Sequence, residues 1–122
     1  MILHAEPVVL IVEDEPLIRM TAAEIFRDDG FVVLEAEDAA AAIEICTSGV
    51  LFQVLFTDIN MPGEMNGVDI AEYIKRLLPD LPIIITSALP IIRSADHLGA
   101  TFIAKPYRGG EVCLEARRLL AG

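Results

Sequence analysis

The sequence predicts an α/β protein with a doubly wound, five-stranded parallel sheet, built from five successive β-α units, (βα)5. Short apolar runs alternate from end to end with segments whose apolar residues recur at helical spacing. Strict alternation of this kind places helices on both faces of a parallel sheet, and right-handed crossovers restrict the sheet to a few doubly wound strand orders. At 122 residues the chain is long enough for one such domain and too short for two.

The first unit is the clearest. Residues 8–12 form a β-branched apolar run, typical of a strand that is buried on both faces. Apolar residues then recur at i, i+4, i+7 and i+8 from Ile18, which predicts a helix over 16–29. Pro16 suits the first turn of this helix, and Gly30 suits its C-terminal end.

The other four units follow the same alternation. Further strands are expected over 31–36, 53–57, 83–86 and 101–104. Further helices are expected over 39–46, 67–78, 90–98 and 112–120. Asp38 is a candidate N-cap for the second helix, and Pro79 and Gly99 come where the third and fourth helices must end.

Composition excludes several classes of function. The formal net charge is -10, which repels nucleic-acid backbones and argues against binding to them. No apolar stretch approaches the roughly 20 residues of a membrane span, and the N-terminus lacks the pattern of a signal peptide. We therefore expect a cytoplasmic protein that binds neither membranes nor nucleic acid. Cys46 and Cys113 are expected to be reduced, packed thiols, since neither has a His or Cys at metal-ligand spacing.

Polar residues stand at the ends of four predicted strands. Glu13 and Asp14 follow the first strand, Asp58 the third, Thr86 ends the fourth, and Lys105 follows the fifth. In a parallel sheet the carboxyl ends of the strands share one edge, where open α/β folds bind ligands. Three carboxylates, a hydroxyl and a lysine at one edge suit Mg²⁺ and a phosphoryl group.

Each of these residues also has a simpler interpretation. Glu13 and Asp14 could cap the first helix, and Asp58 could be a turn residue. Thr86 is a common residue in strands, and Lys105 could be a solvated lysine at a strand end. The coincidence of all four positions with strand ends favours the functional interpretation, in which one acidic residue of the first pair contacts the metal directly and the other acts through water.

Four motifs, taken together, resemble the receiver domain of two-component response regulators over nearly the whole chain. They are Ile11-Val12-Glu13-Asp14-Glu15-Pro16, Asp58-Ile59-Asn60-Met61-Pro62-Gly63 with Asn66-Gly67, Ile85-Thr86-Ser87, and Phe102-Ile103-Ala104-Lys105-Pro106. The resemblance implies a flavodoxin-like (βα)5 sheet in the order 2-1-3-4-5, and one domain over 1–122 without an effector domain, similar to the stand-alone chemotaxis type.

The resemblance also implies a site. Asp58 would be the phosphoacceptor, Asp14 a direct Mg²⁺ ligand and Glu13 an outer-sphere one. Asp58 and the backbone carbonyl of Asn60 would complete the protein's ligands to Mg²⁺.

Other residues would respond to phosphorylation. Thr86 and Lys105 would contact the phosphoryl group, and Phe102 matches the aromatic residue that turns inward when the threonine moves. The Lys105–Pro106 peptide is usually cis in this family, which suits a tight turn that aims the lysine.

The sequence departs from the family pattern in three places. Glu13 replaces the more common Asp. The stretch between Thr86 and Lys105 is about three residues shorter than usual, which trims the fourth helix or the loop before it. Tyr107-Arg108-Gly109-Gly110 replaces the more usual polar entry into the last helix, and its two glycines should loosen that junction.

The predicted function is that of a response regulator in two-component signal transduction or a phosphorelay. Asp58 would accept a phosphoryl group from a histidine kinase or a histidine phosphotransfer protein, and the altered surface would bind an unidentified downstream protein. The alternative is a constitutive adaptor with an idle site. An enzyme acting on external substrates is not expected, because Asn60 stands where a haloacid-dehalogenase-type phosphatase needs an aspartate, and Glu-Asp-Glu-Pro replaces the glycine-rich loop of nucleotide- and flavin-binding sheets.

Overall fold

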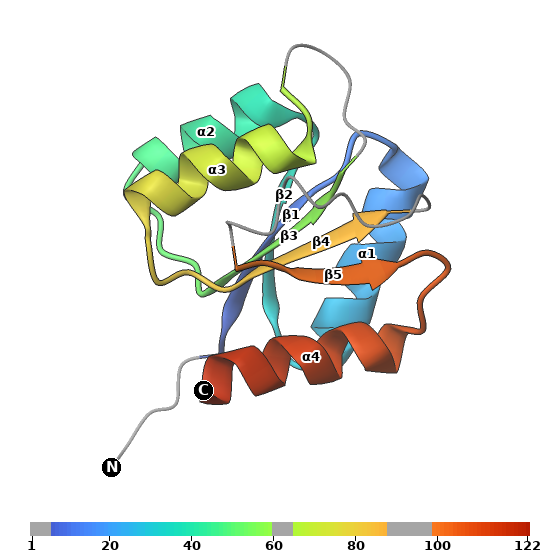
Figure 1. Ribbon diagram of the computed structural model, residues 1–122. Helices are drawn as coiled ribbons and strands as arrows, with labels where there is room; N and C mark the ends of the chain where they lie inside the picture. Colours follow the sequence, from blue (N-terminus) through green and yellow to red (C-terminus); the bar gives the residue numbers. More distant parts are fainter. Residues whose placement is uncertain (1–5, 60–64, 88–98) are drawn as a thin grey trace.

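A computed structural model describes residues 6–59, 65–87 and 99–122. Within these ranges five strands form one parallel sheet in the order β2-β1-β3-β4-β5, so the predicted fold and strand order are confirmed (Figure 1). The strands are β1 (Val8–Val12), β2 (Val32–Ala36), β3 (Val54–Asp58), β4 (Ile83–Ser87) and β5 (Thr101–Ala104). The helices are α1 (Pro16–Asp28), α2 (Ala39–Thr47), α3 (Gly67–Leu77) and α4 (Gly109–Ala121). The helix expected over 90–98 lies outside the described residues.

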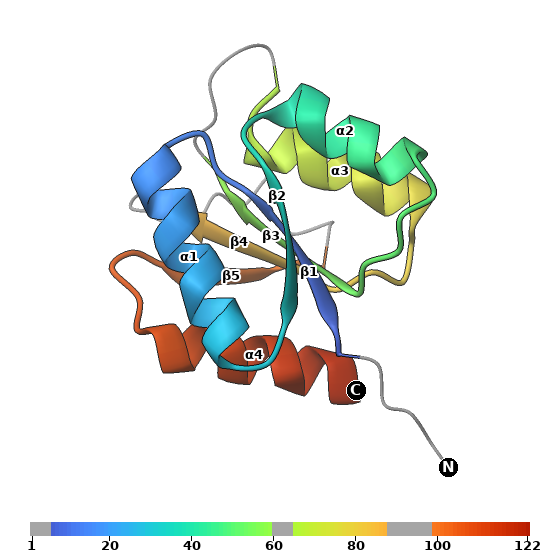
Figure 2. The same ribbon diagram turned by 180° about the vertical axis from the view of Figure 1, so that it is seen from behind.

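The helices form two layers around the sheet. Helices α1 and α4 cover one face, and α2 and α3 cover the other, as the two opposite views show (Figures 1 and 2). Strand β1 supplies side chains to both sides: Val9 and Ile11 join the core under α1 and α4, whereas Leu10 and Val12 join the core under α2 and α3. All four side chains are fully buried, as the continuous apolar run predicts.

Local sequence explains where the helices begin and end. Pro16 starts α1, and Gly30 follows its end with a φ of 93°, a left-handed conformation that glycine adopts without strain. The Asp38 side chain accepts a hydrogen bond of 2.8 Å from the backbone N–H of Ala41, so the predicted N-cap of α2 is confirmed. Such a cap contributes about 1 kcal/mol of helix stability.

Helix α4 begins three residues earlier than the sequence predicts. Gly109 and Gly110 form its first turn instead of a loose junction before it. A Cβ atom on Gly109 would lie only 3.2 Å from the side chain of Ile25 in α1. The absence of that atom therefore lets the start of α4 approach α1 closely.

Helix α3 begins directly against the end of β3. The N–H of Gly67 donates to the carbonyl oxygen of Ile59 at 3.0 Å, and a Cβ atom on Gly67 would lie 2.0 Å from the carbonyl oxygen of Asp58. The Asn66 side chain caps the same helix in a capping box with Asp69. Glycine at 67 therefore fixes the distance between α3 and the backbone of Asp58.

We predict that Gly67→Ala destabilises the protein by several kcal/mol, on the order of the cost of other severe backbone clashes, because the new methyl group would overlap a carbonyl oxygen. Gly110→Ala is the matched control, since nothing lies within 4 Å of its Cβ position inside a helix. It should leave stability unchanged or raise it by about 0.5–1 kcal/mol. Urea unfolding followed by circular dichroism measures both effects, and equal stabilities for the two variants would contradict the role of Gly67.

Candidate functional site

The sheet order brings the predicted site residues to one edge. Strands β1, β3, β4 and β5 are neighbours, and their carboxyl ends carry Glu13, Asp58, Thr86 and Lys105 respectively. The pairing register places Asp58 directly beside Thr86. The convergence that the strand ends predicted is therefore present in the structure.

An ion pair lies at the centre of this edge. The Lys105 ammonium nitrogen is 2.5 Å from Asp58 Oδ2 and 4.0 Å from Glu13 Oε2. The side chains of Asp58 and Glu13 are 9% and 7% exposed, so both carboxyl groups have lost most of their water, whereas Lys105 keeps 23% of its side-chain exposure. In such surroundings a charge-assisted hydrogen bond is stronger than it would be in water.

Backbone hydrogen bonds fix the segments that carry these side chains. The N–H of Lys105 donates to the carbonyl oxygen of Ser87 at 2.9 Å, and the N–H of Ile59 donates to that of Thr86 at 2.9 Å. The Lys105–Pro106 peptide is cis, as the resemblance implied. These bonds extend the strand ladder past the ends of β3 and β5, so the backbone at Asp58 and Lys105 is held by hydrogen bonds to β4.

Burial and neighbouring carboxylates raise the pKa of Glu13 to about 7. Loss of water is the largest cause, the hydrogen bond from the backbone N–H of Glu15 opposes it, and the nearby Asp58 and Asp14 carboxyl groups raise the pKa further. The two other acidic residues of the predicted site therefore both make ionisation of Glu13 less favourable. Asp14 itself is half-buried.

The remaining predicted residues differ in how the structure places them. Thr86 is 1% exposed at the end of β4. Phe102 is half-buried and packs against the core under α2 and α3, in register with Ile85. Asn60, whose carbonyl the resemblance assigned to the metal, lies outside the described residues.

Sequence reasoning missed Arg19, which contacts the acidic segment. Its Nη1 donates to the carbonyl oxygen of Glu13 at 2.9 Å. A signal was present, because Arg19 precedes the buried residues Ala22 and Phe26 by three and seven positions and therefore lies on the apolar stripe of α1. A charged residue on a buried stripe requires a polar partner.

The fold and this edge define the class of receiver-like α/β domains. The family model for the response regulator receiver domain matches residues 9–116. The chain therefore belongs to the response regulator receiver domain family of two-component systems, as the motifs implied. Domains of this family generally bind Mg²⁺ and undergo phosphorylation, and they are not in general enzymes.

Curated relatives agree with this assignment. The chain is 32% identical to sporulation initiation phosphotransferase F of Bacillus subtilis over 108 residues, which cover 85% of this chain and 86% of that protein. It is 36% identical to the transcriptional regulatory protein PdtaR of Mycobacterium tuberculosis over 103 residues, or 81% of this chain. The chain spans only 49% of the length of PdtaR. It spans 24% of the length of the putative NtrX-like response regulator of Rickettsia bellii.

Solved structures share the fold. The response regulator TrrA of Thermotoga maritima, solved in complex with Mg²⁺-BeF, has a TM-score of 0.84 and 27% identity over 93% of this chain and 98% of that chain. A receiver domain protein of Clostridium thermocellum has a TM-score of 0.87 and 25% identity over 94% of both chains.

The residues present at the edge fit a magnesium ion. Mg²⁺ needs only one or two protein carboxylates and keeps several waters, and the buried carboxyl groups of Glu13 and Asp58, with the half-buried Asp14 next to Glu13 in the chain, meet that requirement chemically. Within residues 6–59, 65–87 and 99–122, no three His, Cys, Asp or Glu side chains are arranged around a common metal position. The Lys105 ammonium, 2.5 Å from Asp58, provides the compensating positive charge that the structure describes at this edge.

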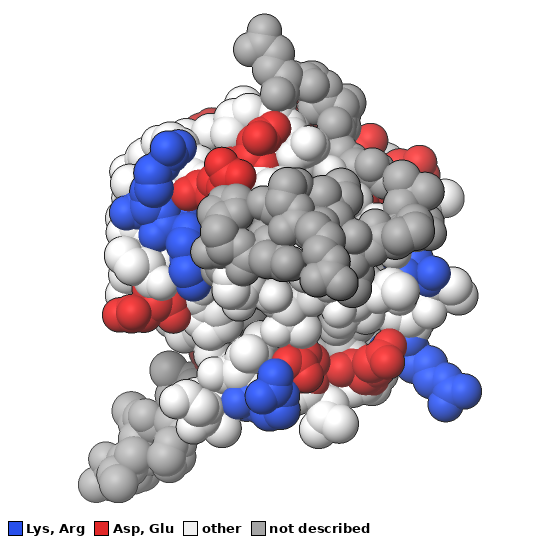
Figure 3. Space-filling model, viewed as in Figure 1, with Lys and Arg blue, Asp and Glu red and all other residues white. Residues whose placement is uncertain are grey.

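Charged side chains of both signs lie on the surface of the described residues. On the face that Figure 3 shows, one group of Lys and Arg side chains runs along the left edge next to Asp and Glu side chains, and the other described basic side chains stand apart. No helix within the described part of the chain is long and apolar enough to cross a membrane.

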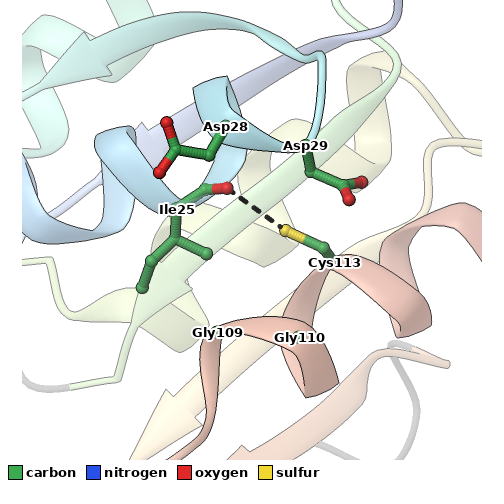
Figure 4. Close-up of a pocket in the computed structure, with 6 residues that line it drawn as sticks. All are labelled: Ile25, Asp28, Asp29, Gly109, Gly110 and Cys113. Carbon is green, nitrogen blue, oxygen red and sulfur yellow. Dashed lines mark hydrogen bonds between the residues drawn. The ribbon is translucent and has the colours of Figure 1, made fainter.

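A hollow of about 270 Å³ lies away from this edge, between the end of α1 and the start of α4. Figure 4 shows Cys113 in it, with its sulfur directed at the carbonyl oxygen of Ile25, 3.6 Å away. Burial and the nearby Asp29 carboxylate, opposed in part by the Arg117 guanidinium, raise the pKa of the Cys113 thiol to about 11. Cys46 and Cys113 are both free thiols, as the sequence predicted.

We predict that Glu13→Gln stabilises the metal-free protein at pH 8 and has little effect below pH 4.5. The pKa of Glu13 is raised from 4.5 to about 7 in the folded state. Between pH 4.5 and 7 the folded protein therefore keeps a proton on Glu13 that the unfolded chain releases. The stability of the wild-type protein falls as the pH rises through this range, because Glu13 must then ionise in its buried position. The gain at pH 8 should be about 1–3 kcal/mol, since each pKa unit corresponds to about 1.4 kcal/mol.

The measurement for Glu13 is urea unfolding in EDTA at pH 8 and pH 4.5. The control is Glu24→Gln, since Glu24 is exposed on α1. Equal effects of the two substitutions at pH 8 would show that burial of Glu13 carries no cost.

We predict that Cys113 resists alkylation. A pKa of about 11 leaves only about 0.1% of the thiol as reactive thiolate at pH 8, so iodoacetamide should modify it roughly 100-fold more slowly than in the unfolded chain. Peptide mass spectrometry after timed alkylation of native and urea-unfolded protein measures this ratio. Similar rates in the two states would contradict the raised pKa.

Proposed function

We propose that this receiver domain accepts a phosphoryl group on Asp58 from the phosphohistidine of a sensor histidine kinase or a histidine phosphotransfer protein. The observation that carries the proposal is the buried Asp58 carboxylate at the carboxyl edge of the sheet, with Lys105 2.5 Å away and with Glu13, whose pKa the Asp58 and Asp14 carboxyl groups raise, 4.0 Å from the same ammonium. The relative named sporulation initiation phosphotransferase F, similar over most of both chains, supports a role in phosphotransfer.

The step is a transfer between two nucleophiles. A carboxylate oxygen of Asp58 attacks the phosphorus and forms a P–O bond, while the P–N bond of the phosphohistidine breaks. The electron pair leaves on the imidazole nitrogen, which then takes up a proton. Lys105 holds a positive charge within hydrogen-bond distance of Asp58, where it can contact an oxygen of the transferred group.

Glu13, Asp14 and Asp58 would hold Mg²⁺ together with the Asn60 backbone carbonyl, with Asp14 as a direct ligand and Glu13 acting through water. When bound, the ion neutralises charge on the phosphoryl oxygens and reduces repulsion between the donor and the acidic edge. The raised pKa of Glu13 supports this assignment, because a carboxyl group that is costly to ionise gains most from a nearby cation.

The output rests on Thr86 and Phe102. The Thr86 hydroxyl lies on the strand residue paired with Asp58, from which it would donate to a phosphoryl oxygen. Phe102 stands on the neighbouring strand and is only half-buried, so part of its ring surface would become buried if it turned inward when Thr86 moves. The altered surface would bind a downstream protein, and phosphorylation would bias two conformations that already exist.

The phosphodonor would approach over an apolar groove of about 510 Å³ beside Lys105. Leu17, 71% exposed, lies in this groove on the first turn of α1. The groove is lined by Leu17, Ile18, Thr21, Ile25, Lys105, Pro106 and Tyr107. An apolar helix of the donor would cover these side chains and bring its phosphohistidine next to Asp58.

The single-domain organisation and the cytoplasmic location of this protein stay predictions.

The test is binding of beryllofluoride, an acyl-phosphate mimic, with and without Mg²⁺, followed by amide NMR. We expect Mg²⁺-dependent shifts at Asp58, Thr86, Phe102 and Lys105 that vanish in Asp58→Asn, together with loss of phosphate incorporation from the cognate kinase. Asp38→Asn, at the cap of α2, is the control and should respond as wild type does.

Two outcomes would contradict the proposal. Wild-type levels of phosphate in Asp58→Asn would show that Asp58 is not the acceptor. Shifts that are absent at any Mg²⁺ concentration, with partner binding unchanged by phosphodonor, would instead support a constitutive adaptor with an idle site.

A further inference from the structure

Arg19 joins α1 to two other parts of the structure. Its Nη1 donates to the carbonyl oxygen of Glu13 at 2.9 Å, and its Nε lies 3.3 Å from Oε1 of Glu35 in β2. The side chain is only 18% exposed. A planar guanidinium donates in two fixed directions, so it can bridge a carbonyl and a carboxylate at the same time.

The carbonyl that Arg19 contacts belongs to the peptide between Glu13 and Asp14. Because a peptide unit is planar, fixing this oxygen also fixes the direction in which the chain leaves toward the Cα atom of Asp14. The other side of Glu13 is held by its N–H, which donates to the carbonyl oxygen of Ala36 at 3.1 Å. Arg19 therefore supplies the second of two constraints on the backbone of the acidic pair.

We infer that Arg19 is a positioning residue for the magnesium site: it orients Asp14, the proposed direct ligand, through the Glu13 carbonyl. The inference rests on the proposed function. It differs from a simple electrostatic effect, because a positive charge this close to the site would by itself repel Mg²⁺. If Arg19 acts by orienting Asp14, removing its side chain should weaken Mg²⁺ binding. If it acts only by electrostatic repulsion, removing its charge should tighten Mg²⁺ binding.

Arg27 offers a matched control. It contacts the same carboxylate, at 3.3 Å from Glu35 Oε2, on the same helix, but it makes no described contact with Glu13. Removing it removes one arginine and one ion pair to Glu35 while the Glu13 carbonyl keeps its donor. A difference between the two variants then reports the contact with Glu13 and not the loss of an ion pair.

The experiment is calorimetric titration of Mg²⁺ into Arg19→Met, Arg19→Lys and Arg27→Met. Methionine keeps an apolar side chain of similar length for packing. We expect Arg19→Met to weaken Mg²⁺ binding roughly ten-fold, the usual effect of losing a residue that orients a ligand. The Mg²⁺ affinity of Arg19→Lys should lie between those of wild type and Arg19→Met. A lysine ammonium can contact either the Glu13 carbonyl or the Glu35 carboxylate well, but it lacks the forked guanidinium that bridges both. Arg27→Met should bind as wild type does.

A metal-free measurement makes the result independent of the proposed function. The N–H of Glu15 donates to Glu13 Oε1 at 3.2 Å, so its hydrogen exchange in EDTA reports whether the acidic segment is held. Exchange should rise in Arg19→Met and stay unchanged in Arg27→Met.

The outcomes separate the two proposals. Tighter or unchanged Mg²⁺ binding in Arg19→Met would overturn the positioning role while leaving the proposed function intact. A wild-type protein that binds no Mg²⁺ would overturn the proposed function, and equal exchange in Arg19→Met and Arg27→Met would overturn the inference about Arg19 whatever the metal does.

Discussion

The ion pair between Lys105 and Asp58 compensates a cost that the fold itself creates. A parallel sheet brings its strand ends to one edge, and the apolar strands and helices around that edge remove water from Glu13 and Asp58. Two desolvated carboxyl groups side by side are unfavourable, and the raised pKa of Glu13 is the direct consequence. The Lys105 ammonium, reaching one carboxylate at 2.5 Å and the other at 4.0 Å, offsets part of that cost.

The backbone around this pair is held on every strand that contributes to it. After the end of β1, the N–H of Glu13 donates to the carbonyl oxygen of Ala36 in β2. After the end of β5, the N–H of Lys105 donates to the carbonyl oxygen of Ser87 in β4. The end of β3 is bonded to β4 and is also contacted by Gly67, which lets α3 begin against the Asp58 carbonyl. A change in charge at the edge therefore acts on side chains within a fixed frame, which is the arrangement a local switch requires.

Much of this structure could be predicted from the sequence, because periodicity and strand-end polarity are local signals. The buried strand at 8–12 and the cap at Asp38 needed only neighbouring residues, and strand order followed from the family motifs. The role of Gly67 depends on a contact with a residue nine positions away, and that of Arg19 on contacts with two separate segments. The start of α4 at Gly109 was missed because two glycines favour a loop in isolation, whereas packing against Ile25 favours them in the helix.

The same electrostatics link the proposed metal and phosphoryl group. Phosphorylation would replace the single negative charge of the Asp58 carboxylate by up to two on the phosphoryl group, near Glu13, where Lys105 already provides positive charge. One ammonium cannot balance that increase in a site with little water. If Asp58 is the phosphoacceptor as proposed, a divalent cation and the phosphoryl group would stabilise each other by the same coupling free energy in both directions, and the affinity for Mg²⁺ would rise when Asp58 is modified. Phosphorylation would thereby draw Lys105 away from its present partner toward the new oxygens, and the movement of that one side chain, beside Thr86 and Phe102, connects the chemistry of Asp58 to the surface of β4 and β5.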